Sequence, residues 1–233
     1  MTTKIQTTEY PVLNTFVTLR NEKKKKGEYL SRRYHNVEEA DTFTKIRATA
    51  GAVTGAALPL IYFAKKQNGK LGSLNQMLRI NYGLKEFITI GASSILGGVL
   101  AGMVGENKDA QEGKIHEGVF QFMNCSVPPV IIAGLFKLGE KFKPLNNVPS
   151  KLAATGIGAV GGMYLAAELS NKINDPKDLY PDRKLTIKDA LANFDDVLGA
   201  LVLAKFKFIE KLGAERLLPA VTAWCGYRAG VSN

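Results

Sequence analysis

Charged and apolar residues are segregated along this chain, so that polar stretches alternate with long runs that contain no charged side chain. Such runs occupy residues 48–64 (17 residues), 87–105 and 118–136 (19 residues each) and 152–167 (16 residues). A helix rises 1.5 Å per residue and the hydrocarbon core of a bilayer is about 30 Å thick, so a spanning helix needs about 20 apolar residues. The pattern predicts an all-α, multi-pass membrane helical bundle, in which the last three runs are the safer spans.

Two further runs are weaker. Residues 190–204 are apolar except for Asn193, Asp195 and Asp196, and residues 217–227 form an apolar run of only 11 residues. Neither would span a bilayer by itself. We therefore expect four to six membrane-embedded helices in a domain covering residues 46–233, preceded by a basic polar arm at residues 1–45.

Loop charges test the orientation of these helices, because basic residues in short loops tend to stay on the cytoplasmic or matrix side. The connections 65–85, 137–151 and 205–216 are basic, and the connections between them are more acidic. The basic arm should then lie on the same side as 65–85, which conflicts with a spanning segment at 48–64. We predict that this segment is re-entrant or interfacial and that Pro59 breaks its helix. The alternative is a spanning segment whose long arm is translocated against the charge rule.

Small residues recur at four-residue spacing in three of the apolar runs, which places them in stripes along one side of each helix. In lipid, close backbone approach along such stripes holds helices together through dispersion contacts. The stripes predict helix packing within the chain or against another subunit, and a soluble bundle with a Gly-rich core is the alternative. The candidate packing residues are Gly51, Gly55, Ser94, Gly98, Gly102, Gly158 and Gly162.

A set of polar residues falls on one face of the helix predicted near 190. Asp189, Asn193 and Asp196 stand at positions 0, 4 and 7, with Asp195 beside them. A carboxylate in hydrocarbon costs several kcal/mol, so it should face the bundle interior or a water-filled cavity. These residues are candidates for an ion or solute path. Otherwise the helix is amphipathic and lies at the membrane surface or against a partner.

A weak internal repeat connects this set with an earlier segment. Residues 115–124 align with 187–196, and 136–142 align with 206–212; a Gly-Gly pair precedes each copy. The alignment fits a duplicated helical hairpin or chance similarity. If the duplication is real, the earlier partners in the polar path are Glu117, Gln121 and Asn124.

The chain is basic, with a formal charge of +10. The run from Lys23 to Lys26 indicates that the arm is either solvated or attracted to anionic lipid head groups. No nucleic-acid recognition motif accompanies the basic run, so we expect no nucleic-acid partner.

The sequence offers no catalytic motif. His35 and His116 have no setting typical of a nucleophile or a metal ligand, and no phosphate-binding or dinucleotide motif is present. We expect no enzymatic activity, no metal and no cofactor.

Three functional hypotheses follow from these patterns. The first is a non-catalytic integral membrane scaffold or accessory subunit that packs through Gly/Ala helix faces against other membrane subunits or a second copy of itself. The second is a small membrane carrier or channel that uses intramembrane acidic residues. The third is a soluble helical bundle. For the first two, a bacterial inner membrane or an organelle membrane is expected, with basic loops on the cytoplasmic or matrix side.

Overall fold

A computed structural model describes residues 40–142, 144, 146–178, 182, 198–199, 201–202 and 212–233, and all regular structure in these residues is helical. Most of it belongs to four helices, α2 (Thr42–Asn68), α4 (Leu84–Gly102), α5 (Lys108–Lys141) and α6 (Val148–Asn174). Each is long and apolar enough to cross a membrane. The predicted all-α bundle is therefore confirmed.

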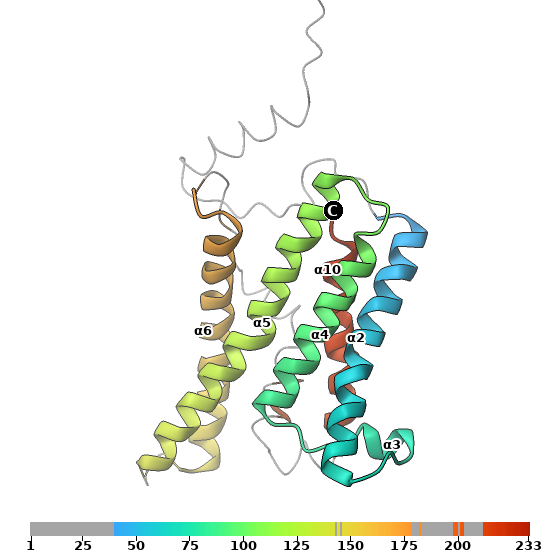
Figure 1. Cartoon of the computed structure of the whole chain (residues 1–233). Helices are drawn as coiled ribbons and strands as arrows, with labels where there is room; N and C mark the ends of the chain where they lie inside the picture. The colour runs from blue at the N-terminus through green and yellow to red at the C-terminus, as the bar shows by residue number, and fades with distance from the viewer. Residues whose placement is uncertain are drawn as a thin grey trace, which may run out of the picture.

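The helices form two groups that share α5. Helices α2, α4 and α10 (Leu218–Val231) pack against one another, while α5 lies beside α4 and α10 and carries α6 on its other side (Figure 1). The short helices α3 (Leu74–Met77) and η3 (Ala214–Leu217) lie in the connections before α4 and α10. A larger apolar core fills the first group, and a smaller one around Ile132 and Met163 joins α5 to α6.

Helix α2 begins at Thr42, within the segment predicted as the basic arm. Asp41 caps it, because its carboxylate accepts a hydrogen bond from the backbone N–H of Thr44 at 2.6 Å. That bond favours the ionised form and holds the pKa of Asp41 below its usual value. The helix therefore includes Lys45 and Arg47, which precede the charge-free run.

The prediction that Pro59 breaks the first segment is wrong. Helix α2 continues through Pro59 for 27 residues, about 40 Å at 1.5 Å per residue. Proline removes one N–H and crowds the carbonyl of Gly55, four residues earlier, but packing against neighbouring helices can compensate for this in a bundle. The re-entrant or interfacial placement thus loses its physical basis. A helix of spanning length fits instead: α2 runs the length of the bundle, and its first residues and the 65–85 connection lie at opposite ends (Figure 1).

Two prolines in α5 also leave their helix uninterrupted. The helix passes through Pro128 and Pro129 and extends for 34 residues, well beyond the charge-free run at 118–136. Both prolines are buried, and Pro128 packs against Gly162 of α6. The close contact between these helices accounts for the smaller apolar core.

The later predicted elements are covered only in part. Residues 198–199 and 201–202 are helical, but Asn193, Asp195 and Asp196 lie outside the described residues. The second copy of the proposed repeat, except Leu212, lies outside them as well, so the duplication stays a prediction. Helix α10 covers 14 residues, about 21 Å, which is too short to cross a bilayer alone.

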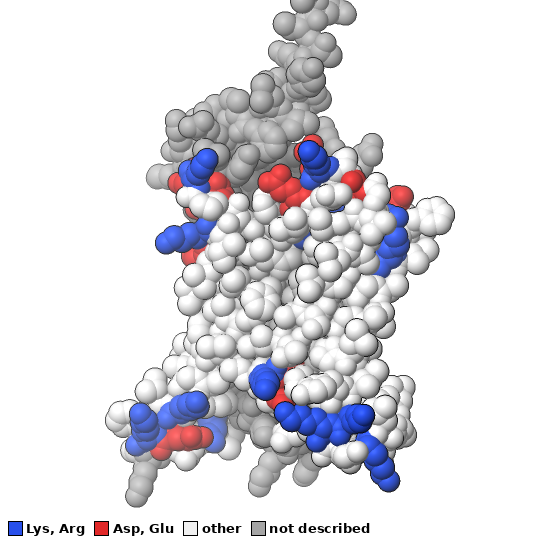
Figure 2. Space-filling model, in the orientation of Figure 1, with Lys and Arg blue, Asp and Glu red and all other residues white. Residues whose placement is uncertain are grey.

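Charged side chains collect at the two ends of the bundle and leave an apolar band between them (Figure 2). We call one end the lysine-rich end; it contains the connections 65–85 and 137–151. The other, the Glu106 end, contains the connection between α4 and α5. Large apolar side chains are exposed in the band, among them Leu58 (64%), Leu96 (59%) and Ile157 (68%). Together with the four apolar helices, this band suggests a membrane protein.

Candidate functional site: glycine seams and buried polar side chains

Helix α4 packs backbone to backbone against two neighbours through its small residues. A Cβ atom added at Gly98 or Gly102 would lie under 3.0 Å from the backbone of Gly226 or Gly230 in α10. A Cβ at Gly97 would meet the backbone of Gly51 in α2 equally closely. Adjacent glycines of α4 therefore serve different partners, and we call these contacts the α4 seams.

The α4 seam with α2 contains the other predicted packing residues of these two helices. A Cβ at Gly55 would lie under 3.0 Å from the backbone of Ser93 and Ser94. The hydroxyl of Ser94, which is fully buried, donates to the carbonyl oxygen of Ala52 at 2.9 Å. A buried interhelical hydrogen bond of this kind adds to dispersion contacts in an apolar surrounding. The predicted stripe thus packs within the chain.

Helix α6 has a packed glycine face and an open one. A Cβ at Gly158 would lie under 3.0 Å from the side chain of Ile132, and one at Gly162 equally close to Pro128, both on α5. In contrast, a Cβ at Gly156 or Gly161 would have no neighbour within 4 Å. The inner face of α6 is therefore committed to α5, and small residues remain on its outer face.

The three predicted polar residues of α5 share one face, as their spacing requires. The side-chain amide of Gln121 donates to the carboxylate of Glu117 at 2.8 Å. Asn124 lies about one turn further along; it is 2% exposed, and its carbonyl oxygen Oδ1 has no hydrogen-bond partner. A buried acceptor without a partner is unfavourable by about 1–3 kcal/mol, so Asn124 departs from the usual rule for buried polar groups.

Arg228 of α10 brings a positive charge to this polar face. Its guanidinium nitrogen Nη2 lies 4.0 Å from the Glu117 carboxylate, and both side chains are mostly buried, with exposed fractions of 23% and 12%. Arg228 was not predicted, because it follows the short apolar run at 217–227. The structure thus joins Glu117 and Gln121 to an arginine that is distant in sequence. Their predicted counterparts, Asp189, Asn193, Asp195 and Asp196, lie outside the described residues.

A second polar group lies at the Glu106 end, and we call it the Glu106 cluster: Thr44, Arg47, Glu106, Lys114 and Asn233. Lys114 on α5 is fully buried, and its ammonium lies 3.8 Å from the Glu106 carboxylate. The same ammonium donates to the carbonyl oxygen of Ser232 at 3.2 Å and to the side-chain oxygen of Asn233. The cluster therefore ties the residues after α10 to the start of α5.

The Glu106 cluster also fixes the start of α2. The hydroxyl of Thr44 donates to the Glu106 carboxylate at 2.7 Å, and the guanidinium of Arg47 donates to the Thr44 hydroxyl at 2.8 Å. Nε of Arg47, the guanidinium nitrogen that carries one hydrogen, is buried and has no hydrogen-bond partner. Sequence analysis missed this cluster because its charged members stand outside the charge-free runs: Arg47 directly precedes the first run, and Glu106 and Lys114 lie in the loop before the third. One signal was available: Lys114 stands three residues before Glu117, on the same helical face.

Within the described ranges, no three His, Cys, Asp or Glu side chains are grouped as metal ligands would be. Cys125 and Cys225 both lie in the larger apolar core, where a thiol packs as a small apolar group. The chemistry that these sites offer is close helix packing, buried charge pairing and hydrogen bonding.

No known family model matches the chain, and neither curated proteins nor solved structures give a significant match. The arguments about function therefore depend on the geometry of this chain.

Proposed function

We propose that this protein is a non-catalytic integral membrane scaffold or accessory subunit that binds a transmembrane helix of a partner on the outer face of α6. The observation that supports this most is the pair of open glycines, Gly156 and Gly161. They stand among exposed apolar side chains of the same face: Ile157, Val160, Tyr164 and Leu165. The two glycines stand five residues apart, on the two flanks of this exposed face, and each leaves a gap beside which a second helix can approach closely.

Exposed apolar residues alone would not distinguish a partner from lipid, since both are apolar. The glycines do favour a partner. A helix surface that faces only lipid gains nothing from residues without a side chain, and glycine lowers helix stability by up to about 1 kcal/mol relative to alanine in water. The inner glycines of α6 contact α5, which shows how such positions are used elsewhere in the same helix.

The proposed setting is a bacterial inner membrane or an organelle membrane. The lysine-rich end would face the cytoplasm or matrix, following the tendency of short basic loops. Since α2 runs from one end of the bundle to the other, the chain before Thr42 would then start from the opposite side. Anionic lipid head groups remain proposed partners of the basic arm.

The double variant Gly156→Leu/Gly161→Leu tests the α6 interface. We expect the tagged protein, extracted from its native membrane in a mild detergent, to elute as a complex larger than its own 25.3 kDa plus detergent. The double variant should lose the co-eluting partner by at least tenfold, because the two leucines fill the gaps on both flanks of the face. Its thermal unfolding in detergent should change little, since a Cβ at either position has no described neighbour within 4 Å and the side chain extends from an exposed face.

Val53→Leu is the matched control, because it enlarges an exposed residue of the apolar band on α2, away from the α6 face; the partner should be retained. A wild-type protein that elutes alone, or a complex that survives both leucines, would contradict the scaffold proposal.

The buried Glu117 and the unsatisfied Asn124 favour the carrier or channel as the second candidate. Ion- or pH-dependent flux in vesicles that is abolished by Glu117→Gln or Asp196→Asn would favour it over the scaffold.

A further inference from the structure

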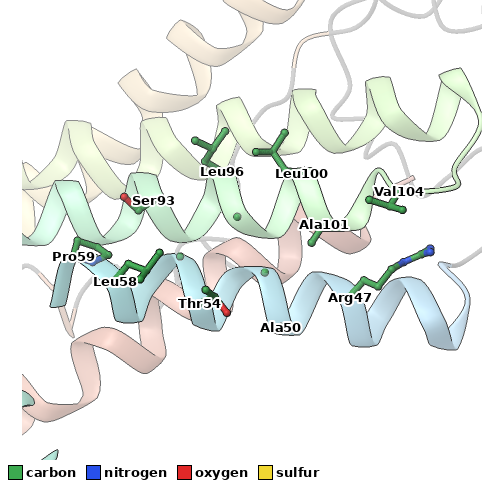
Figure 3. A pocket seen from close by; sticks show the side chains of 13 residues that line it. Arg47, Ala50, Thr54, Leu58, Pro59, Ser93, Leu96, Leu100, Ala101 and Val104 are labelled. Atoms are coloured by element: carbon green, nitrogen blue, oxygen red, sulfur yellow. The ribbon is translucent and has the colours of Figure 1, made fainter. Parts of the chain in front are cut away.

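An apolar groove runs along the outer side of the seam between α2 and α4 (Figure 3). Its volume is about 610 Å³. The glycine contacts bring the two helix backbones together, so the floor of the groove consists of small residues while larger side chains rise beside it. The walls include Leu58 of α2 and Leu96 and Leu100 of α4. The groove is a consequence of the seam, because bulky residues at its floor would hold the helices apart.

One charged residue lines this groove, and it stands at the mouth. Arg47 and Val104 lie at one end, and Pro59 and Ser93 lie at the other (Figure 3). The mouth belongs to the Glu106 end, where charged side chains mark the boundary of the apolar band. The Arg47 guanidinium is held there by Thr44 and has a buried Nε without a hydrogen-bond partner. Among the described residues no carboxylate lines the groove, so Arg47 is the charge that an occupant would meet; the Asp41 and Glu106 carboxylates lie near Arg47 but outside the lining.

The length of the groove matches one leaflet of a bilayer. From Arg47 to Pro59 α2 advances 12 residues, about 18 Å at 1.5 Å per residue. Half of a hydrocarbon core measures about 15 Å. The groove therefore starts at the level of the head groups and ends near the middle of the membrane.

We propose that this groove binds one phospholipid, with the phosphate at Arg47 and one acyl chain lying over Gly51 and Gly55. An arginine guanidinium pairs well with a phosphate, through several directed N–H donors and a full charge. A partner helix fits less well, because the glycines of the floor, Gly51 and Gly55, already contact the backbone of α4, unlike the open glycines of α6. A helix with its side chains is also about 10–12 Å wide and would rest on the leucine walls. The inference depends on the membrane placement of α2 and α4 and is independent of the α6 interface.

Native mass spectrometry of the purified full chain with added dioleoylphosphatidylglycerol tests the site. The wild type should retain one lipid molecule per chain through detergent exchange. Arg47→Gln should lower the singly bound fraction at least fivefold. The double variant Ala50→Leu/Thr54→Leu should do the same, because both side chains line the groove and their enlargement would fill it.

Two controls separate the groove from general lipid adhesion. Lys172→Gln removes one exposed positive charge from the same end of the bundle, and Ala153→Leu enlarges an exposed residue on α6; both should bind lipid as the wild type does. If Arg47→Gln impairs folding, the groove-filling variant decides the matter. The proposal is overturned if the wild type retains no lipid, if the filled groove still binds it, or if Lys172→Gln loses as much as Arg47→Gln.

Discussion

Gly98→Leu is expected to prevent the bundle from folding, so that no monodisperse protein is recovered in detergent. Even a single added carbon at Gly98 would lie under 3.0 Å from the carbonyl of Gly226, and this neighbour is backbone that cannot rotate away. Overpacking a tight site costs about 1–3 kcal/mol, and occasionally more, when the surroundings can shift. At a contact between two backbones, relief requires α10 to move as a whole, with the loss of its other contacts with α4.

The smaller change Gly98→Ala gives the quantitative form of this prediction. It should lower the free energy of unfolding by about 2 kcal/mol or more, by analogy with overpacked cores. Gly226→Ala, in the same seam, should have a similar effect, because a Cβ there would lie under 3.0 Å from the backbone of Ser94. Gly161→Ala is the control, because a Cβ there meets nothing within 4 Å. Thermal unfolding followed by circular dichroism measures all three; equal unfolding temperatures for Gly98→Ala and Gly161→Ala would contradict the seam.

Glu106→Ala should have the second-largest effect, through the charge that it leaves behind. Lys114 is fully buried and lies 3.8 Å from the Glu106 carboxylate, which also accepts the Thr44 hydroxyl. Removing one member of a buried ion pair destabilises proteins by about 3–5 kcal/mol, because the remaining charge is uncompensated. For a chain of this size, 1 kcal/mol corresponds to about 2–4 °C, so the unfolding temperature should fall by about 6–20 °C.

A second substitution shows that the stranded ammonium is the cause. Glu106→Ala/Lys114→Met removes both charges and should recover much of the loss, which gives a coupling energy in a double-mutant cycle. Glu112→Ala is the control, on the same helix as Lys114, since that carboxylate is 67% exposed and pairs only with the nearby His116 in the described contacts. An exposed pair contributes about 0–1 kcal/mol. Equal losses of stability from Glu106→Ala and Glu112→Ala would show that the Glu106 carboxylate does not stabilise the buried Lys114 ammonium.

The alternation of charged and charge-free runs was sufficient to predict the helical class and the positions of α4, α5 and α6. It underestimated helix length, because amphipathic ends extend into charged segments: α5 begins ten residues before its charge-free run. The Pro59 prediction failed for a related reason. The missing N–H and the ring of Pro59 oppose a helix. The packing of nearby small residues of α2, such as Gly55, against α4 outweighs this cost.

The spacing of polar residues predicted the shared face of Glu117, Gln121 and Asn124, since residues three and four apart are neighbours on a helix. It could not predict Arg228 or the Glu106 cluster. Several of these contacts join positions separated by more than 60 residues, such as Thr44 and Glu106 or Glu117 and Arg228, and only the arrangement of the helices brings them together. In the same way, small-residue stripes indicate close packing, but the choice of α10 for Gly98 and α2 for Gly97 depends on the fold.

Alkaline carbonate extraction of membranes from cells that express the protein tests most directly whether lipid surrounds the apolar band. We expect the chain to remain in the pellet with the bilayer and to enter solution only with detergent, because Leu58, Leu96 and Ile157 are exposed at the surface of the bundle. A folded, monodisperse protein recovered in aqueous buffer without detergent would contradict the membrane placement, and with it the lipid groove and the α6 interface.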